Sequence, residues 1–245
     1  MAELKIGGDN DFEQLLRLGG FPEPFLAGDD RFARRWTRDY RDRLLREELP
    51  SLERVDDIGR LEQMVLRLPD LVGSPLSINA LREDLQVAHR TVARWLDVLE
   101  QLYSIFRLPP FGAPRIRAVK KEQKHYHFDW SVVTDEGARF ENLIASHLLK
   151  WVHYQQDVEG RDAELRYFRD IDGREVDFVV QIDRKPVSFI ECKLTAGPVS
   201  KGLSYLKARF PNVDAWQVFA RGQADFINRD GIRVRHARNL LRALV

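Results

Sequence analysis

The sequence has few of the features that mark several common protein classes. Cys192 is its single cysteine among 245 residues, so an internal disulfide is excluded and a reducing, cytoplasmic location is expected. No stretch approaches the ~20 apolar residues of a membrane span, and the N-terminus lacks a signal-peptide pattern. We therefore expect no membrane partner. The 39 basic and 38 acidic residues leave a formal net charge of +1, so any nucleic-acid binding must depend on local patches.

Several catalytic motifs are also missing. No G-x-S-x-G string is present, which argues against a serine hydrolase. No G-x-x-x-x-G-K-[ST] phosphate loop is present, so nucleotide hydrolysis cannot be assigned to these residues. His125 and His127 are two apart, but no cysteine or second histidine pair stands at a matching spacing, which disfavours zinc. The sequence has no internal repeats.

The first region, residues 1–68, reads as helical. From Phe32 to about Leu68 it is rich in charge and arginine, with apolar residues near helical spacing. Before it, Leu18–Pro24 (Leu-Gly-Gly-Phe-Pro-Glu-Pro) predicts a loop where a helix stops.

The second region, residues 69–119, resembles a winged helix-turn-helix. Ser77 is a good N-cap for a helix over Ile78–Leu85, and a second helix is expected over His89–Leu102, followed by a strand to Leu108. The second helix of this motif usually enters the major groove. The residues near its N-terminal end that we expect to contact DNA are Arg90, Thr91 and Arg94. The alternative is a module for domain packing, whose arginines are simply solvated.

The third region, residues 120–245, alternates strands and helices, which predicts an α/β sheet domain. A strand is expected over Lys124–Asp129 and an amphipathic helix over Arg139–Trp151. Three strands are expected at Leu165–Phe168, Arg174–Gln181 and Val187–Lys193, with Asp183–Pro186 as the turn between the last two. A further helix at 201–210 and a strand at 215–219 follow.

Two of these strands carry a candidate catalytic constellation. Alternation predicts Glu175, Asp177 and Val179 on one face of their strand, and it predicts that Glu191 and Lys193 project together. A hairpin would bring these residues side by side. Carboxylates hold a hard cation such as Mg²⁺, and a lysine can activate water or contact a phosphate. The alternative is a solvated edge strand on which Glu191 and Lys193 form an ordinary exposed pair.

The surroundings of this constellation are also predicted by the sequence. Glu141 follows Phe140 on the inward side of its helix, from where its side chain can reach the sheet, although a solvated glutamate is the alternative. We expect Lys193 to be buried, and therefore to need a partner that neutralises it. Cys192 alternates with Glu191 and Lys193, which predicts a core residue rather than a nucleophile.

The strings "GARFENLIASHLLK", "RYFRDIDGREVDFVV", "SFIECKLT" and "KGLSYLKARFP" resemble the C-terminal domain of a large bacterial and archaeal group of AAA-type ATPases. Upstream, "GGFPEPFL", "RRWTRDYRDRLLREEL" and "KHYHFD" are also similar to those proteins. The resemblance implies a restriction-endonuclease-like fold of the PD-(D/E)XK kind, whose helix glutamate, V-D-F strand and E-x-K strand match Glu141, Asp177, Glu191 and Lys193. Those proteins carry an N-terminal ATPase domain that this sequence lacks. The chain is therefore expected to be a truncated product, a stand-alone version or a fragment.

Two functions follow as hypotheses. The first is a DNA-directed, Mg²⁺-dependent nuclease in which Asp177 and Glu191 hold the metal, Lys193 positions or activates water, and Glu141 completes or orients the metal site. In it, Arg117 and Lys120, part of a basic stretch that also holds Arg115, Lys121 and Lys124, are expected to contact the DNA backbone; a solvated linker is the alternative. The second hypothesis is a nuclease fold without catalysis, serving as a regulatory or interaction module for an ATPase partner in trans or for a homo-oligomer.

Overall fold

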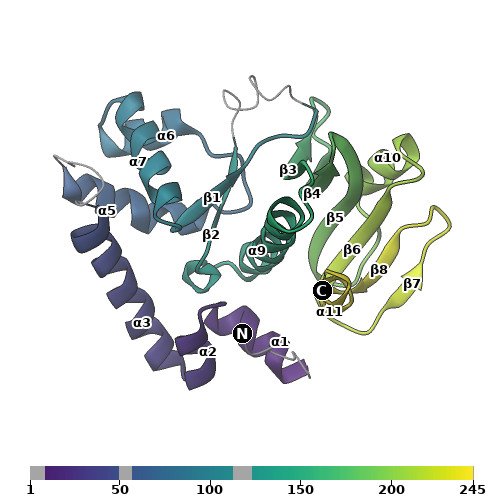
Figure 1. The fold of residues 1–245 in the computed structure, drawn as a ribbon, viewed down its shortest axis with the longest axis horizontal. Coiled ribbons are helices and arrows are strands. Elements are labelled where there is room, and N and C mark those ends of the chain that lie inside the picture. Colours follow the sequence, from purple (N-terminus) through teal and green to yellow (C-terminus); the bar gives the residue numbers. More distant parts are fainter. Residues whose placement is uncertain (1–8, 50–56, 113–122, 245) are drawn as a thin grey trace. The chain divides into compact units, whose positions relative to one another are not determined.

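The computed structural model describes residues 9–49, 57–112 and 123–244 of the chain (Figure 1). The protein is mixed α/β, with N-terminal helices followed by a mixed sheet, as predicted. It divides into two compact units. The first holds Met1–Val72, Ser77–Phe106 and Tyr126–Asp135, and the second holds Gly73–Leu76, Arg107–His125 and Glu136–Val245. Within the described ranges, no helix combines the length and apolarity that crossing a membrane requires.

The first unit is built mainly from helices. They are α1 (Asp9–Leu18), α2 (Pro22–Ala27), α3 (Asp30–Arg43) with a π-helical continuation at Leu44–Glu48, α5 (Ile58–Arg67), α6 (Ile78–Leu85) and α7 (His89–Gln101). Short 3₁₀ turns occur at Leu68–Leu71 and Trp130–Val132. The loop predicted at Leu18–Pro24 is shorter than expected, because α2 begins inside it at Pro22. Proline suits the first helical position, where its missing N–H is not needed.

The two glycines of this loop allow a close approach to the segment that follows β2. A Cβ at Gly19, whose φ is +85°, would lie 2.8 Å from Asp129 Oδ1, and a Cβ at Gly20 would lie 2.3 Å from the Trp130 ring. Trp130 Nε1 donates to Leu15 O at 2.9 Å. Asp129 accepts hydrogen bonds from Ser131 N at 3.1 Å, Ser131 Oγ at 2.6 Å and Thr37 Oγ1 at 3.0 Å. The start of the "GGFPEPFL" string and the end of the "KHYHFD" string therefore lie side by side in the first unit.

The helix-turn-helix pattern is present in α6 and α7. Ser77 Oγ accepts from Ala80 N at 3.3 Å and caps α6 as predicted. Helix α6 ends at Gln86, whose φ of 53° turns the chain into α7. The inner face of α7 is buried along Val92, Trp95, Leu96 and Leu99. Strands β1 (Ile105–Leu108) and β2 (Lys124–His127) then pair in a two-stranded sheet.

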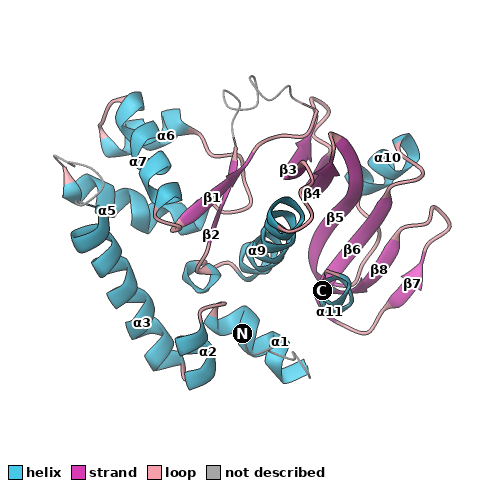
Figure 2. Ribbon diagram, in the orientation of Figure 1, coloured by secondary structure: helices cyan, strands magenta, loops and turns pink. Residues whose placement is uncertain are grey.

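The second unit is a six-stranded sheet with helices on its faces (Figure 2). In spatial order its strands are β3 (Ala163–Arg169), β4 (Glu175–Ile182), β5 (Lys185–Thr195), β6 (Asp214–Arg221), β8 (Arg233–His236) and β7 (Asp225–Ile227). The pairs β3–β4, β4–β5 and β7–β8 are antiparallel, whereas β5–β6 and β6–β8 are parallel.

Helices cover this sheet from both sides. Figure 1 shows α9 (Glu136–Asp157) on one side and α10 (Lys201–Arg209) on the other; the short helix α11 (Ala237–Ala243) contacts β6 and β8. The layer under α10 is apolar. It consists of Val176, Val179, Phe189, Leu203, Leu206, Ala215 and Ile232. Sheets covered on both faces need apolar residues on both sides of their strands, which explains the consecutive buried residues Phe178–Val180 in β4 and Phe189–Ile190 in β5.

The predicted alternation along β4 is wrong in one respect. Val176 pairs with Phe168 and Val179 pairs with Arg166. Between these two pairs, β4 contains one residue more than β3. This bulge puts Val176 and Val179 into the same apolar layer. Strict alternation predicted that Val179 shares a face with Glu175 and Asp177, and this prediction is wrong.

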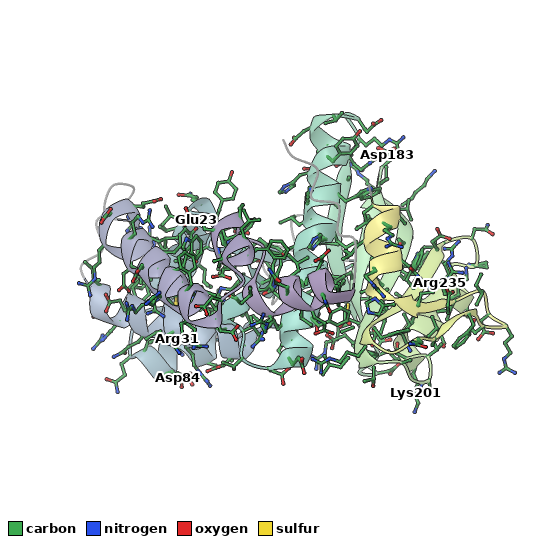
Figure 3. The ribbon with its side chains drawn as sticks, turned by 90° about the horizontal axis from the view of Figure 1, so that it is seen from below. Glu23, Arg31, Asp84, Asp183, Lys201 and Arg235 are labelled. Carbon is green, nitrogen blue, oxygen red and sulfur yellow. The ribbon has the colours of Figure 1, made fainter. Side chains whose placement is uncertain are left out.

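The hairpin between β4 and β5 sets the register of the candidate site. Ile182 pairs with Lys185 across the two turn residues Asp183 and Arg184, which both have positive φ, 51° and 65°. Figure 3 labels Asp183 at the tip of this hairpin. The pairing continues to Phe178 and Ile190. Asp177 is thereby brought to the level of Glu191, as the sequence predicted for a hairpin at this position.

Candidate active site

The second unit brings together the carboxylates predicted from the sequence. Glu141 comes from α9, Asp177 from β4 and Glu191 from β5. The backbone N–H of Cys192 donates to Asp177 Oδ2 at 2.8 Å. The Asp177 carboxylate therefore lies against the backbone between Glu191 and Lys193. This is the arrangement that a two-strand carboxylate site requires.

Glu191 is the most constrained of these groups. Its residue is 5% exposed, and its Oε1 accepts from Lys193 Nζ at 2.7 Å. Among the residues that the structure describes, its other oxygen, Oε2, is buried without a hydrogen-bond partner, which is costly for a carboxylate. Burial and the neighbouring Asp177 carboxylate raise the pKa of Glu191 to about 7, and the Lys193 and Lys124 ammonium groups oppose that shift. The site thus holds a carboxylate oxygen ready to accept a proton or a cation.

Lys193 is not the buried lysine that the sequence indicated. Its side chain is 46% exposed, and its ammonium group reaches back to Glu191. Desolvation lowers the pKa of Lys193, but the hydrogen bond and charge of Glu191 outweigh it and raise the pKa overall. Lys193 is therefore a charged, half-exposed group beside Glu191, accessible to solvent and to a ligand.

The buried lysine is Lys124, which the sequence analysis placed in a solvated basic stretch. Lys124 is 0% exposed, and its Nζ lies 2.6 Å from Glu175 Oε1, 3.2 Å from Glu141 Oε1 and 3.5 Å from Asp177 Oδ1. Burial lowers the pKa of Lys124, but the carboxylates of Glu141, Asp177 and Glu175 raise it by more. The net shift is upward, so the ammonium stays charged. Both Lys124 and Glu175 were missed as site residues. A signal was available, because Lys124 begins an expected strand and Glu175 precedes Asp177 by two positions.

The Glu141 carboxylate lies close to the backbone of Gly73. A Cβ at Gly73 would lie 3.1 Å from Glu141 Oε2, and the φ of Gly73 is +84°. The neighbouring residues pair with β2, since Leu76 N donates to Gln123 O at 2.8 Å and Pro75 bridges to Lys124. The segment Gly73–Leu76 therefore supports both Lys124 and Glu141.

The site residues suit Mg²⁺ in their chemistry. Within the described ranges, no group of three or more His, Cys, Asp or Glu residues is placed to hold a metal ion. Mg²⁺ usually keeps several waters and takes only one or two protein carboxylates. Asp177 and Glu191 supply two, one of them with the unpartnered oxygen. These two residues therefore fit a Mg²⁺ ion that keeps most of its water ligands. They do not fit a Mg²⁺ ion that is coordinated by protein groups alone.

Cys192 separates Glu191 from Lys193 and is the free cysteine of the chain. Burial raises the pKa of the Cys192 thiol well above its usual range, and Asp177, Glu141 and Glu191 add to this effect. A thiol held in its protonated form is a poor nucleophile. The contribution of Cys192 is its backbone N–H, which orients Asp177.

The residues predicted to bind DNA are only partly described. Arg90 and Arg94 are exposed on α7, and Thr91 beside them is partly buried. Arg117 and Lys120 lie outside the described residues. The three α7 residues form one solvent-facing surface near the N-terminal end of the helix, and their contact with DNA stays a prediction.

Comparison with family models divides the chain at one position. Residues 9–135 match a domain of unknown function (DUF8612), which covers more than half of the chain. The chain belongs to the DUF8612 family. In this DUF8612 protein, residues 136–234 match a second domain of unknown function (DUF4143). Neither the curated proteins nor the solved structures give a match.

The family boundary separates the site residues of the DUF8612 chain. Glu141, Glu175, Asp177, Glu191 and Lys193 lie in the DUF4143 match, whereas Lys124 lies in the DUF8612 match. The boundary at 135/136 coincides with the start of the last segment of the second unit at Glu136. A site confined to the DUF4143 segment would therefore lack its buried ammonium group.

Proposed function

We propose that the protein is a DNA-directed, Mg²⁺-dependent nuclease of the PD-(D/E)XK kind, with its catalytic centre at Asp177, Glu191 and Lys193. The observation that carries the proposal is the Cys192 N–H to Asp177 hydrogen bond of 2.8 Å, beside a buried Glu191 oxygen without a hydrogen-bond partner. The resemblance to the C-terminal domain of AAA-type ATPases supports it. The single cysteine supports a cytoplasmic setting.

The chemistry is divided among a few groups. Asp177 and Glu191 would hold Mg²⁺, which supplies Lewis-acid stabilisation and lowers the pKa of bound water. Lys193, half exposed and hydrogen bonded to Glu191, would place its ammonium beside the attacking water or the scissile phosphate. Glu141 would act on Asp177 indirectly, through the Lys124 ammonium that contacts both. On α7, Arg90, Thr91 and Arg94 would dock on duplex DNA, with Arg117 and Lys120 along the backbone.

The test is cleavage of plasmid, linear duplex, single-stranded DNA and RNA by the full chain in Mg²⁺ or Mn²⁺. Asp177→Asn should lower the cleavage rate by more than the roughly 10- to 100-fold that loss of an outer-shell partner costs. Asp183→Asn, at the exposed hairpin tip, is the matched control and should cleave like the wild type. Cleavage that persists undiminished in Asp177→Asn would contradict the proposal.

A second candidate is a nuclease fold without catalysis that serves as an interaction module for an ATPase partner or a second copy. It is favoured by the Lys124 ammonium, which already neutralises part of the carboxylate cluster. The DUF4143 match also favours it, because this domain commonly accompanies AAA-type ATPases. This candidate predicts a folded wild-type chain that neither binds Mn²⁺ nor cleaves any of the substrates, and that co-elutes with an ATPase or as an oligomer in size-exclusion chromatography.

A further inference from the structure

Lys124 is buried and contacts charged and aromatic side chains of the second unit. Its ammonium contacts one carboxylate from α9 and two from β4, at 3.2, 2.6 and 3.5 Å. The ring of Tyr167, on β3, lies 5.7 Å from Nζ and adds a cation–π contact. A side chain with 0% exposure and three anionic neighbours is fixed in place, since leaving would strand three carboxylates without a counter-charge.

The three carboxylates around Lys124 form an anionic surrounding that a buried cation neutralises. Nucleases with two metal ions place the ions about 3.5–4 Å apart, between shared carboxylates. Here Asp177 is the shared group. Its Oδ2 faces the backbone of the E-x-K strand, and its Oδ1 faces Lys124. The side of Asp177 that lies beside Glu191 accepts a backbone hydrogen bond, and the other side is taken by the ammonium.

The charges of the site agree with a single additional cation. Four carboxylates (Glu141, Glu175, Asp177 and Glu191) face two ammonium groups (Lys124 and Lys193), which leaves two negative charges when all are ionised. Arg169, 52% exposed, lies 3.9 Å from Glu175 Oε2, and counting its guanidinium leaves one negative charge. One divalent cation brings the cluster near neutrality, whereas two would leave an excess of positive charge around buried side chains.

We infer that Lys124 is an internal cation that permanently occupies one of the two cation positions of this cluster, so that the site takes a single divalent cation, at Asp177 and Glu191. The inference deepens the proposed function and rests on it for the divalent cation. It makes Lys124 a positioning residue, which orients Asp177 from the side opposite to Cys192 N.

The experiment is a calorimetric titration of the full chain with Mn²⁺ alone, without nucleic acid. The wild type should bind one Mn²⁺ per chain. Lys124→Met removes the ammonium while keeping most of the side-chain volume, and it should bind two. Lys150→Met, which removes an exposed lysine from α9, is the control and should stay at one. Urea unfolding in parallel should show that Mn²⁺ stabilises Lys124→Met more than the wild type, because a cation that binds only the folded state stabilises it.

The outcomes separate this inference from the proposed function. Two Mn²⁺ in the wild type, or one in folded Lys124→Met at unchanged affinity, would overturn the assignment of Lys124. No binding to the wild type, together with binding to Lys124→Met, would overturn the proposed function and support Lys124 as the internal cation. No binding to either protein would overturn both.

Lys124→Met leaves three carboxylates without their ammonium, which destabilises the folded variant. The double variant Lys124→Met/Glu175→Gln removes one of these charges and keeps Glu141 and Asp177 as oxygen ligands. It should also bind two Mn²⁺, and a value of one with unchanged affinity would overturn the inference in the same way.

Discussion

Asp129 is a buried carboxylate whose oxygens accept hydrogen bonds from Thr37 and Ser131. Desolvation raises its pKa above the usual value of 3.8, and the three hydrogen bonds only partly offset this. A carboxyl group whose pKa is higher in the folded state binds more protons there than in the unfolded chain. Its contribution to stability is therefore fully present below pH 3.8 and is lost as the pH rises through the folded-state pKa.

Asp129→Asn should remove this pH dependence, because the amide keeps an acceptor for Ser131 and carries no charge. Between about pH 4 and pH 7, the free energy of unfolding of the wild type should fall relative to that of the variant. Urea denaturation of both proteins across this range measures the difference. Parallel stability profiles would contradict the account of Asp129. Asp129→Ala leaves the buried donors unsatisfied and should cost roughly 1–3 kcal/mol at every pH.

Four residues of the site were predicted from the sequence, and the buried lysine was not. Glu141, Asp177, Glu191 and Lys193 could be named because the E-x-K and V-D-F patterns are local and periodic. Lys124 was missed although it begins an expected strand, because its burial depends on carboxylates from two distant elements, α9 and β4. A lysine in a basic stretch reads as solvated until those partners are known. The same reasoning assigned burial to Lys193, which is half exposed.

At the scale of elements, the packing of α10 on β4 depends on one glycine. A Cβ at Gly202 would lie 2.0 Å from the carbonyl oxygen of Glu175, a backbone atom that cannot move without shifting the strand. Gly202→Ala should therefore destabilise the protein by about 3 kcal/mol, the upper end of the usual cost of overpacking.

Gly197→Ala is the matched control, since a Cβ there meets nothing within 4 Å. It should stay within about 0.5 kcal/mol of the wild type. Thermal or urea unfolding of both variants measures the contrast. Equal stabilities would show that the approach of α10 to β4 is looser than the structure describes.

The helices and strands themselves were largely predictable. Ser77 capping α6, a turn between β4 and β5, and helix α10 follow from local rules about caps, turns and periodicity. The turn was predicted as Asp183–Pro186, but it has two residues, because Lys185 already pairs with Ile182. The bulge in β4 was not predictable, because strict alternation assumes an uninterrupted ladder, and the extra residue is imposed by pairing with β3. The start of α2 at Pro22 was missed because proline was read as a loop marker only.

At the scale of the whole molecule, the second unit is discontinuous in sequence. Besides Lys124, it includes Pro109–Phe111, which runs beside β3: Phe111 N donates to Tyr167 O at 2.6 Å and Tyr167 N donates to Pro109 O at 3.2 Å. A fragment that begins at the family boundary, 136–245, lacks both features. It should be less stable than fragment 107–245 by about 3–5 kcal/mol, the cost of breaking a buried ion pair.

Urea denaturation of the two fragments measures this difference, and fragment 107–245 carrying Lys124→Met separates its causes. If the ammonium dominates, this variant should be nearly as unstable as 136–245. If the pairing of Pro109–Phe111 dominates, it should resemble the unmodified longer fragment. Equal stability of 136–245 and 107–245 would show that neither feature matters for folding.

The central claim is that Asp177 and Glu191 form a divalent-cation site, and Mn²⁺ titration calorimetry on the wild type and Asp177→Asn tests it most directly. Circular dichroism would first establish that both proteins are folded. The account predicts one Mn²⁺ bound per wild-type chain and none bound by Asp177→Asn. A folded wild type that binds no Mn²⁺, or an Asp177→Asn variant that binds it with unchanged affinity, would contradict the claim.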